Sequence, residues 1–367
     1  MPIPYGRQSI GDEEIEAVTR VLRGSWLTQG PAIENFETAV AEYVEAKHAV
    51  AFSSGTAALH GAAWASGLGL GDVAYTSPIT FMATPNAARY VGAKPGLLDI
   101  RAETWNLDLS RLPGDADAVF PVHYAGLPVD LHEISEWKQK PRIVIEDAAH
   151  ALGASTPDGP VGNCANSDLT CFSFHPVKPI TTGEGGMVTT NEPELADRLR
   201  RFRSHGIVRS GADSKWRYEI SELGHHYRMT DIQAALGTVQ MTRLSAFIER
   251  RNEIAEIYRH RLAGLPIILP PEAGQGFVHG YHLFPVRVPN REEVYDSFHA
   301  KDIRVQVHYV PVHHHPISSD LVENDDGFPT ADWLYGGLLS LPIFPDMVPG
   351  DIDEVVHCLE ASLESVG

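Results

Sequence analysis

The feature that most constrains the fold is an alternation of short apolar runs with helix-like segments through the first half of the chain. The apolar runs that predict buried strands cover residues 49–52, 72–76, 94–100, 118–122, 142–146 and 169–173. Helical patterns lie between several of them, at residues 57–65, 81–90 and 131–138. Strands and helices that alternate at this spacing are typical of a mostly parallel sheet with helices on both faces. Ligands of such sheets bind beyond the carboxyl ends of the strands.

The remaining segments predict how the rest of the chain is organised. Further helices are expected at residues 12–23, 33–44, 193–202, 230–244, 245–262 and 351–363, and further strands at 283–288 and 305–308. The helix at 245–262 is long and amphipathic, and we expect it to lead into a smaller unit. The expected fold is therefore α/β, with a large three-layer domain over residues 1–244 and a small α+β domain over residues 245–367.

Composition argues against several classes of function. The 367 residues carry a formal net charge of −19, which argues against a general nucleic-acid or membrane-surface binder. No apolar run approaches the ~20 residues that span a bilayer, and the N-terminus lacks the features of a signal peptide. The three cysteines, Cys164, Cys171 and Cys358, are too few and too scattered for a disulfide framework. We therefore expect a cytoplasmic protein with no membrane or nucleic-acid partner.

A carboxylate and a lysine that follow the predicted strand at 142–146 suggest covalent catalysis. Asp147 directly follows that strand, and Lys178 lies between Pro176 and Pro179. Because proline cannot continue a helix, Lys178 is expected on a constrained turn. Pyridoxal 5′-phosphate (PLP) chemistry requires a lysine that forms a Schiff base and a carboxylate that keeps the pyridine nitrogen protonated. The spacing alone leaves open that Asp147 caps a helix and that Lys178 is a solvated lysine.

A second candidate site follows the first predicted strand. There, small residues that include Gly55 and Thr56 lead into an alanine-rich helix. Unpaired backbone N–H groups and the helix dipole converge at such an N-terminus, which suits it to an anion such as phosphate. A capped helix with nothing bound would have the same sequence. Phe81 and His123 also follow strand-like runs, so these candidates are expected at one edge of the sheet.

A series of motifs in a fixed order resembles a known family. The motifs are AFSSGTAALH, TFMATPNAA, PVHYAGLPVDL, VIEDAAHALGA, FSFHPVKPITTGEGG, RSHGI and HYRMTDIQAALG. From Gln8 to about Tyr309 the chain resembles the DegT/DnrJ/EryC1/StrS family of PLP-dependent nucleotide-sugar aminotransferases. The resemblance implies the fold-type-I aminotransferase architecture, PLP as cofactor, and a homodimer with both active sites at the interface.

Carried over position by position, the resemblance implies a cofactor site. Lys178 matches the Schiff-base lysine and proton shuttle, and Asp147 matches the partner of the pyridine nitrogen. The other implied cofactor contacts are His150 near the ring hydroxyl, Gly55, Thr56 and Ser173 around the phosphate, and Phe81 stacked on the ring. Without the motifs, Phe81 could equally be a core aromatic and Ser173 an ordinary strand-end serine. The candidate substrate contacts are Tyr5, Trp26, Arg228, His308 and Tyr309.

One position departs from the family pattern. Relatives commonly carry an asparagine that reaches the cofactor phosphate of the other subunit, and here His226 takes its place just before Tyr227 and Arg228. Imidazole can also donate a hydrogen bond, and its protonated form attracts phosphate more strongly. We expect His226 to bind the partner's cofactor phosphate; the alternative is that its ring packs within the loop.

The resemblance also narrows the reaction. SFHPVKPITTGEGG, WLTQGP and VQVHYVPVH are similar to the pseudaminic-acid branch, which aminates C4 of a UDP-linked 4-keto-6-deoxy-N-acetylhexosamine. The expected amino donor is L-glutamate. The rival substrates are a dTDP- or GDP-linked keto sugar or a keto-cyclitol, used in antibiotic or surface-glycan biosynthesis. Lys178 argues against the dehydratase members of the family, which replace that lysine. A non-enzymatic regulator would need a DNA-binding segment, which the acidic charge does not support.

Three adjacent histidines invite a metal interpretation. His313, His314 and His315 lie in a proline-flanked loop. Adjacent side chains are expected to point in different directions and lack the spaced-ligand pattern of a zinc site. We therefore expect no bound metal and interpret this segment as a substrate-side loop.

Overall fold

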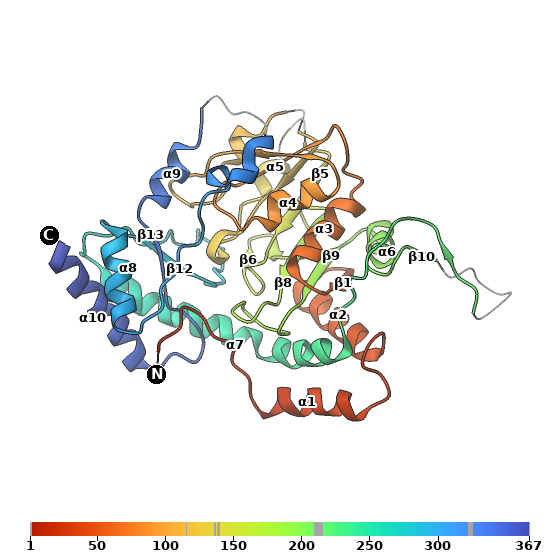
Figure 1. Cartoon of the computed structure of the whole chain (residues 1–367), viewed down its shortest axis with the longest axis horizontal. Helices are drawn as coiled ribbons and strands as arrows, with labels where there is room; N and C mark the ends of the chain where they lie inside the picture. Colours follow the sequence, from red (N-terminus) through yellow and green to blue (C-terminus); the bar gives the residue numbers. More distant parts are fainter. Residues whose placement is uncertain are drawn as a thin grey trace.

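A mixed, mostly parallel sheet forms the centre of the molecule (Figure 1). The computed structural model describes residues 2–114, 116–135, 137, 140–208, 216–321 and 326–366, and within these ranges the main sheet has seven strands in the order β1-β9-β8-β5-β4-β2-β3. The strands are β1 (His48–Phe52), β2 (Val73–Thr76), β3 (Lys94–Leu97), β4 (Ala118–Phe120), β5 (Ile143–Asp147), β8 (Leu169–Ser173) and β9 (Gly186–Thr190). β9 alone among them runs antiparallel to its neighbours, and the other pairings from β3 to β8 are parallel. The α/β class predicted from the sequence is confirmed.

Helices α3 (Gly55–Ala65), α4 (Ala83–Tyr90) and α6 (Pro193–Phe202) cover one face of this sheet. Six of the 11 residues of α3 are small alanine or glycine side chains that are buried against the strands. A helix with so little side-chain bulk can lie close to the sheet, and its first turn therefore meets the carboxyl end of β1 and the end of β8. This places the predicted anion site at the expected edge.

The other face is covered by α2 (Pro31–Val44) and α7 (Asp231–Leu262), whose apolar side chains pack on residues such as Phe172 and Met187. Thr230 caps α7, because its hydroxyl accepts a hydrogen bond from the backbone N–H of Gln233. In return, the side-chain oxygen of Gln233 accepts a hydrogen bond from the backbone N–H of Thr230. The sequence predicts two helices, at 230–244 and 245–262, and this division is wrong. No proline or glycine stands at residues 244–246, so the helix continues without a break.

A second core lies around the C-terminal half of α7. β12 (Phe284–Arg287) pairs antiparallel with β13 (Leu338–Leu341), and α8 (Arg291–Ala300) and α10 (Pro349–Val366) pack against them. The N-terminal segment joins this core through Ile3, which is buried and bridges to Ile303. The boundary between residues 244 and 245 stays a prediction, since α7 runs through it without interruption.

Two other expectations differ from the structure. The strand predicted at 305–308 is absent from the described residues, and only Gln306 forms an isolated bridge to Ser340. The helix predicted at 131–138 is the short α5 (His132–Ser135), and residues 136 and 138 lie outside the described part of the chain.

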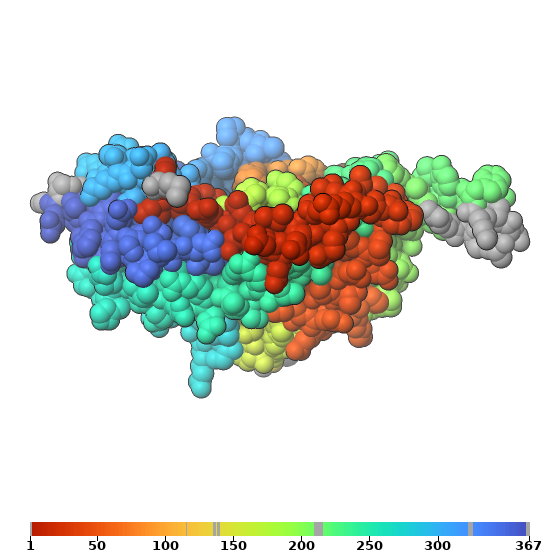
Figure 2. Space-filling model, turned by 90° about the horizontal axis from the view of Figure 1, so that it is seen from below, coloured from red at the N-terminus to blue at the C-terminus, as the bar shows by residue number. Residues whose placement is uncertain are grey.

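The remaining elements belong to neither of these two sheets. They are α1 (Asp12–Arg23), the hairpins β6 (Ser155–Thr156)–β7 (Gly159–Pro160) and β10 (Ile207–Val208)–β11 (Glu219–Ile220), α9 (Pro329–Tyr335), and the 3₁₀ turns η1 (Leu109–Arg111), η2 (Tyr124–Gly126), η3 (Val312–His314) and η4 (Pro316–Asp320). β10 and β11 project from the body (Figure 1), and α1 lies along the face seen in Figure 2. The buried Glu14 of α1 accepts hydrogen bonds from Gln240 and Arg243 of α7, each at 2.7 Å.

Among the helices of the described ranges, none is long and apolar enough to cross a membrane.

Candidate active site

Lys178 and Asp147 meet beyond the carboxyl end of β5. The Lys178 turn is closed by a hydrogen bond from its N–H to the carbonyl of His175 at 2.9 Å, as the flanking prolines predict. Burial lowers the pKa of Lys178 to about 8, although the nearby Asp147 carboxylate pulls it upward. A lysine with this pKa is partly neutral near physiological pH and is therefore a competent nucleophile and base.

The Asp147 carboxylate is buried and held in a fixed orientation. The hydroxyl of Thr84 in α4 donates to its Oδ2 at 2.6 Å, and the backbone N–H of Ala149 donates to its Oδ1 at 3.1 Å. The helix-cap alternative considered from the sequence accounts only for the second of these contacts. Thr84 belongs to the TFMATPNAA motif but was not predicted as a site residue, since nothing local to it points to Asp147.

Two imidazoles and a phenol form a group near Lys178. Nε2 of His150 lies 3.0 Å from the hydroxyl of Tyr309, and the ring of His282 lies 4.4 Å from that of His150. Burial, together with the charge of Lys178, lowers the pKa of His150 and of His282 well below the ordinary value, so both rings are neutral. His282 was missed, because it follows no predicted strand and comes to the site from the second core.

The predicted substrate contacts Tyr5, His308 and Tyr309 lie together on one side of this group. The ring of Tyr5 is 5.1 Å from that of His308, and the carbonyl of His308 accepts from the hydroxyl of Tyr124 at 2.6 Å. Phe81 is 60% exposed, and its ring lies 5.9 Å from that of Tyr309. An exposed aromatic at the mouth of a buried polar site can stack on a bound ring, and the core alternative for Phe81 is thereby wrong.

The predicted phosphate cradle is a close junction between the first turn of α3 and the end of β8. A Cβ on Gly55 would lie 2.8 Å from Cβ of Ser173, and one on Gly186 would lie 2.3 Å from the carbonyl oxygen of Ser54. Only glycine fits at either position. The hydroxyl of Ser54 caps α3 by accepting from Ala57, which leaves the N–H groups of Gly55 and Thr56 at the helix end to face an anion.

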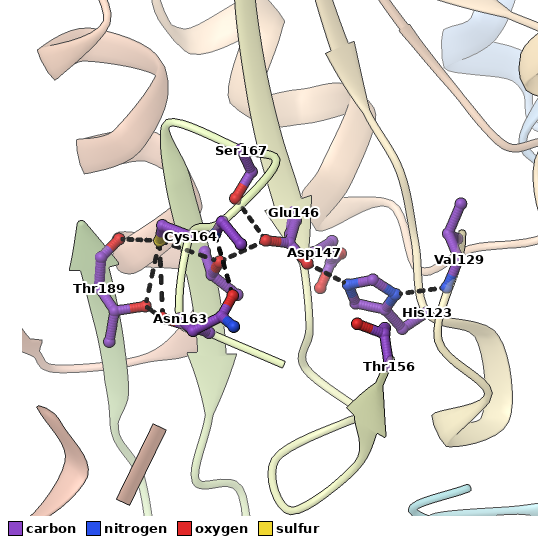
Figure 3. Close-up of polar contacts among 12 residues, drawn as sticks. His123, Val129, Glu146, Asp147, Thr156, Asn163, Cys164, Ser167 and Thr189 are labelled. Atoms are coloured by element: carbon purple, nitrogen blue, oxygen red, sulfur yellow. Dashed lines mark hydrogen bonds and ion pairs between the residues drawn. The ribbon is translucent and has the colours of Figure 1, made fainter. Parts of the chain in front are cut away.

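Behind Asp147, a buried network holds the end of β5 (Figure 3). Glu146 accepts hydrogen bonds from His123 at 2.7 Å, from Thr170 at 2.7 Å and from Ser167. The backbone N–H of Val129 donates to Nδ1 of His123, so the ring proton lies on Nε2 and is donated to Glu146. Although burial raises the pKa of Glu146, these donors outweigh it and hold the pKa below its usual value. Glu146 is therefore a buried anion, and His123 is its partner rather than a group that faces the site.

Three predicted residues lie elsewhere in the subunit. Trp26 is 59% exposed in the loop between α1 and α2. The ring of His226 packs 5.4 Å from that of His205. Arg228 lines a cavity of about 600 Å³ beside α2 and α6, and its Nε is buried without a partner. In the part of the chain that the structure describes, none of the three contacts Lys178 or Asp147.

The three histidines of the predicted loop differ from expectation. The expectation that adjacent side chains diverge is wrong for His313 and His314, because Nε2 of each lies within 3.0 Å of Oδ1 of Asp332. His315 is not part of this group.

The three cysteines are free and buried, and burial raises the pKa of Cys164 to about 12, so its thiol is inert.

The residues at this site fit PLP. A buried carboxylate is available for the pyridine nitrogen, a lysine of lowered pKa for the aldehyde, and a glycine-lined helix N-terminus for the phosphate. Nδ1 of His150 is buried and has no hydrogen-bond partner, which suits it to a polar substituent on the ring. The fold and the site together therefore suit a PLP-dependent aminotransferase.

Comparisons with known proteins agree with this class. The model of the DegT/DnrJ/EryC1/StrS aminotransferase family matches residues 8–360, and the chain belongs to this family. It is 37% identical to the spore coat polysaccharide biosynthesis protein SpsC of Bacillus subtilis, with 97% of this chain and 96% of SpsC aligned.

Solved structures also superpose along the whole chain. PseC of Helicobacter pylori, an aminotransferase involved in the biosynthesis of pseudoaminic acid, superposes with a TM-score of 0.92 at 28% identity over 100% of both chains. The putative sugar aminotransferase Spr1654 of Streptococcus pneumoniae, solved in a PLP form, superposes with a TM-score of 0.90 at 26% identity over 100% of both chains.

The lowered pKa of Lys178 predicts how cofactor capture depends on pH. Only the neutral amine attacks an aldehyde, so the rate at which the cofactor-free protein takes up PLP should rise with pH and level off above about 8. In Asp147→Asn the attractive charge is lost, and the midpoint should move to lower pH. Stopped-flow absorbance measures the rate, and Glu354→Gln, an exposed change on α10, is the control. A midpoint near 10.5 in the wild type would contradict the assignment.

The Glu146 network predicts a stability effect that depends on pH. Glu146→Gln turns an acceptor of three hydrogen bonds into a group with one acceptor oxygen, and should lower the free energy of unfolding by about 2–3 kcal/mol near neutral pH. Because the pKa of Glu146 is lowered on folding, its contribution is present above the ordinary carboxyl pKa and is lost as pH falls through the folded value. The difference from wild type should therefore shrink in acid. Thermal unfolding across that range measures this, and an equal difference at all pH values would argue against an anionic Glu146.

Proposed function

We propose that the protein transfers an amino group from an amino acid, L-glutamate by family analogy, to C4 of a nucleotide-linked 4-keto-6-deoxy sugar. The sugar we favour is a UDP-linked N-acetylhexosamine, as in pseudaminic-acid-type biosynthesis. The observation that carries the proposal is the buried amine of Lys178 beside Asp147, surrounded by neutral histidines. Similarity to PseC along the whole chain supports the choice of sugar.

Each residue of the site has a chemical task in this proposal. When bound, PLP supplies an electron sink for the negative charge that develops on the reacting carbon. Nζ of Lys178 would hold the cofactor and, when released, carry the proton to and from that carbon. Asp147 would hold the proton on the ring nitrogen, and Thr84 keeps the carboxylate pointed at it. His150 would contact the ring hydroxyl, while Gly55, Thr56 and Ser173 would bind the phosphate.

Tyr5, His308 and Tyr309 are the proposed sugar contacts. They lie together on one side of the site, and burial raises the pKa of Tyr309 so that its hydroxyl stays protonated. Hydroxyl and imidazole groups of this kind can donate to or accept from sugar hydroxyls without bringing charge into the site. The amino-acid donor and the nucleotide sugar would occupy this side in turn.

We also propose a cytoplasmic homodimer in which Trp26, His226 and Arg228 act in the partner's site. Two observations support the proposal. Among the described residues, these three side chains make no contact with Lys178 of their own subunit. In addition, Nε of Arg228 has no hydrogen-bond partner, and a second subunit could supply one. His226 would then bind the partner's cofactor phosphate.

A second candidate is a different nucleotide keto sugar used in a surface polysaccharide. It is favoured by SpsC, whose name refers to spore coat polysaccharide and whose identity of 37% exceeds that of PseC at 28%. An amination assay with glutamate against UDP-, dTDP- and GDP-linked 4-keto sugars, with product mass and stereochemistry determined, separates the two candidates. Turnover of none of these sugars would contradict the proposed function.

The role of Lys178 can be tested directly. Borohydride reduction of the protein loaded with PLP, followed by peptide mapping, should place the cofactor on Lys178. Lys178→Ala should retain its fold, bind PLP without a covalent bond, and lose turnover by several orders of magnitude. Lys301→Ala, an exposed change in the small domain, should match the wild type. Transamination retained by Lys178→Ala would refute the assignment.

Action across the interface predicts complementation between inactive variants. Mixed subunits of Lys178→Ala and Arg228→Ala should form hybrid dimers with one intact site, and activity should return to roughly a quarter of wild type. If Arg228 acts in its own subunit, no intact site forms and no activity returns.

The proposed contact between His226 and the partner's phosphate predicts how substitutions change cofactor affinity. An imidazole N–H and an asparagine amide can each donate a hydrogen bond to phosphate, and alanine has no side-chain donor. His226→Asn should therefore retain most of the affinity for PLP, and His226→Ala should weaken it. Equal affinities in all three proteins would show that the ring only packs in its loop.

A further inference from the structure

Outside the cofactor site, three potential metal ligands converge between η3 and α9. Nε2 of His313 lies 2.9 Å from Oδ1 of Asp332, and Nε2 of His314 lies 3.0 Å from the same oxygen. The three ligand atoms lie within 4.8 Å of one another. Asp332 and His314 are exposed, so an ion can reach the group from solvent.

The two rings are held in this arrangement by aromatic neighbours. The ring of His313 lies 4.6 Å from that of Phe328, and the ring of His314 packs edge-on to Tyr335 at 5.4 Å. The two imidazoles are themselves 4.4 Å apart and inclined by 72°. Nδ1 of His313 is buried without a partner, so Nε2 is the nitrogen that this ring can offer to an ion.

The two segments that carry the ligands are each tied to the large sheet. η3 is anchored by a hydrogen bond from the N–H of Val312 to the carbonyl of Pro78 at 2.9 Å. α9 is anchored by Asp99, whose carboxylate accepts from the N–H groups of Thr330 and Ala331, both at 2.9 Å. Because both sides are positioned by other contacts, little ordering is needed to bring the ligands together.

Two imidazoles and a carboxylate are ligands typical of zinc and similar ions, with water in the fourth position. Tetrahedral ligands about 2.0–2.1 Å from an ion lie roughly 3.3–3.4 Å apart. The nitrogen–oxygen distances of 2.9 and 3.0 Å therefore require an outward shift of only a few tenths of an ångström. Without an ion, the same geometry would be two imidazole N–H groups that donate to Asp332.

We propose that His313, His314 and Asp332 bind one divalent transition-metal ion of the zinc class. The ion takes no part in amino transfer. It clamps η3 to α9 and so fixes the loop that runs from Tyr309 beside the active site. This function is independent of the sugar and of the amino donor.

Metal titration of the intact holoenzyme tests the proposal. Untagged protein is freed of metal with a chelator and titrated with Co²⁺, whose four-coordinate complexes absorb visible light, and with Zn²⁺ by calorimetry. The expected result is one ion per subunit and a rise of a few degrees in melting temperature at saturating Zn²⁺. Mg²⁺, which prefers six oxygen ligands, should give no such rise.

Variants locate the ion. His314→Gln and Asp332→Asn, both on exposed positions, should each weaken Zn²⁺ binding at least tenfold and abolish the Co²⁺ spectrum, while circular dichroism stays unchanged. The matched control is His315→Gln, which removes the adjacent histidine outside the group and should bind as wild type. Absence of a stoichiometric site in the wild type, or equal binding in His314→Gln and Asp332→Asn, would overturn the proposal. Binding weakened equally by His315→Gln would overturn it too.

Discussion

The active site depends on two adjacent carboxylates at the end of β5. Successive side chains on a strand point to opposite faces, so Glu146 and Asp147 serve different sides. Glu146 is surrounded by the donors of His123, Ser167 and Thr170, and this buried network ties the strand end to its neighbours. A buried carboxylate without partners costs several kcal/mol. The hydrogen bonds to Glu146 come from its protein neighbours, so Asp147 is the carboxylate available to a ligand. Hydrogen bonds from Thr84 and Ala149 orient the Asp147 carboxylate.

The charges around Lys178 follow from this arrangement. Burial and the lysine's own charge keep His150, His282 and His308 neutral, since each has a lowered pKa. The imidazoles therefore provide hydrogen bonds without competing with Lys178 for Asp147. The site presents one amine, one carboxylate and several neutral donors in a region largely shielded from water, where each interaction is stronger than in solution.

Local sequence patterns predicted the parts of the site that lie in one stretch of chain. The strands, the constrained turn of Lys178 and the position of Asp147 follow from apolar runs, prolines and strand ends, and the structure agrees. Thr84 and His282 could not be predicted, because their contacts join segments that are far apart in sequence. The convergence of His313 and His314 on Asp332 was missed for the same reason, since adjacency in sequence gave no sign of a shared partner on α9. The sequence prediction also divided the single helix α7 in two at residues 244–245, although no proline or glycine stands there to interrupt it.

The proposed cofactor contacts and the proposed sugar contacts come from different segments of the fold. Gly55 and Asp147 lie at the ends of strands in the large sheet and Lys178 lies on the turn after β8, whereas His282 lies shortly before β12 and Tyr5 belongs to the N-terminal segment. The buried Arg251 of α7 positions this second group, because it donates to the carbonyls of Tyr281 at 3.1 Å and Ile343 at 2.9 Å, and Ile343 in turn donates to the carbonyl of Tyr5 at 3.1 Å. Under the proposed function, substitutions among the second group would therefore alter which sugar is bound without moving the lysine or the carboxylate. A fold organised in this way can keep one chemistry while its substrate changes.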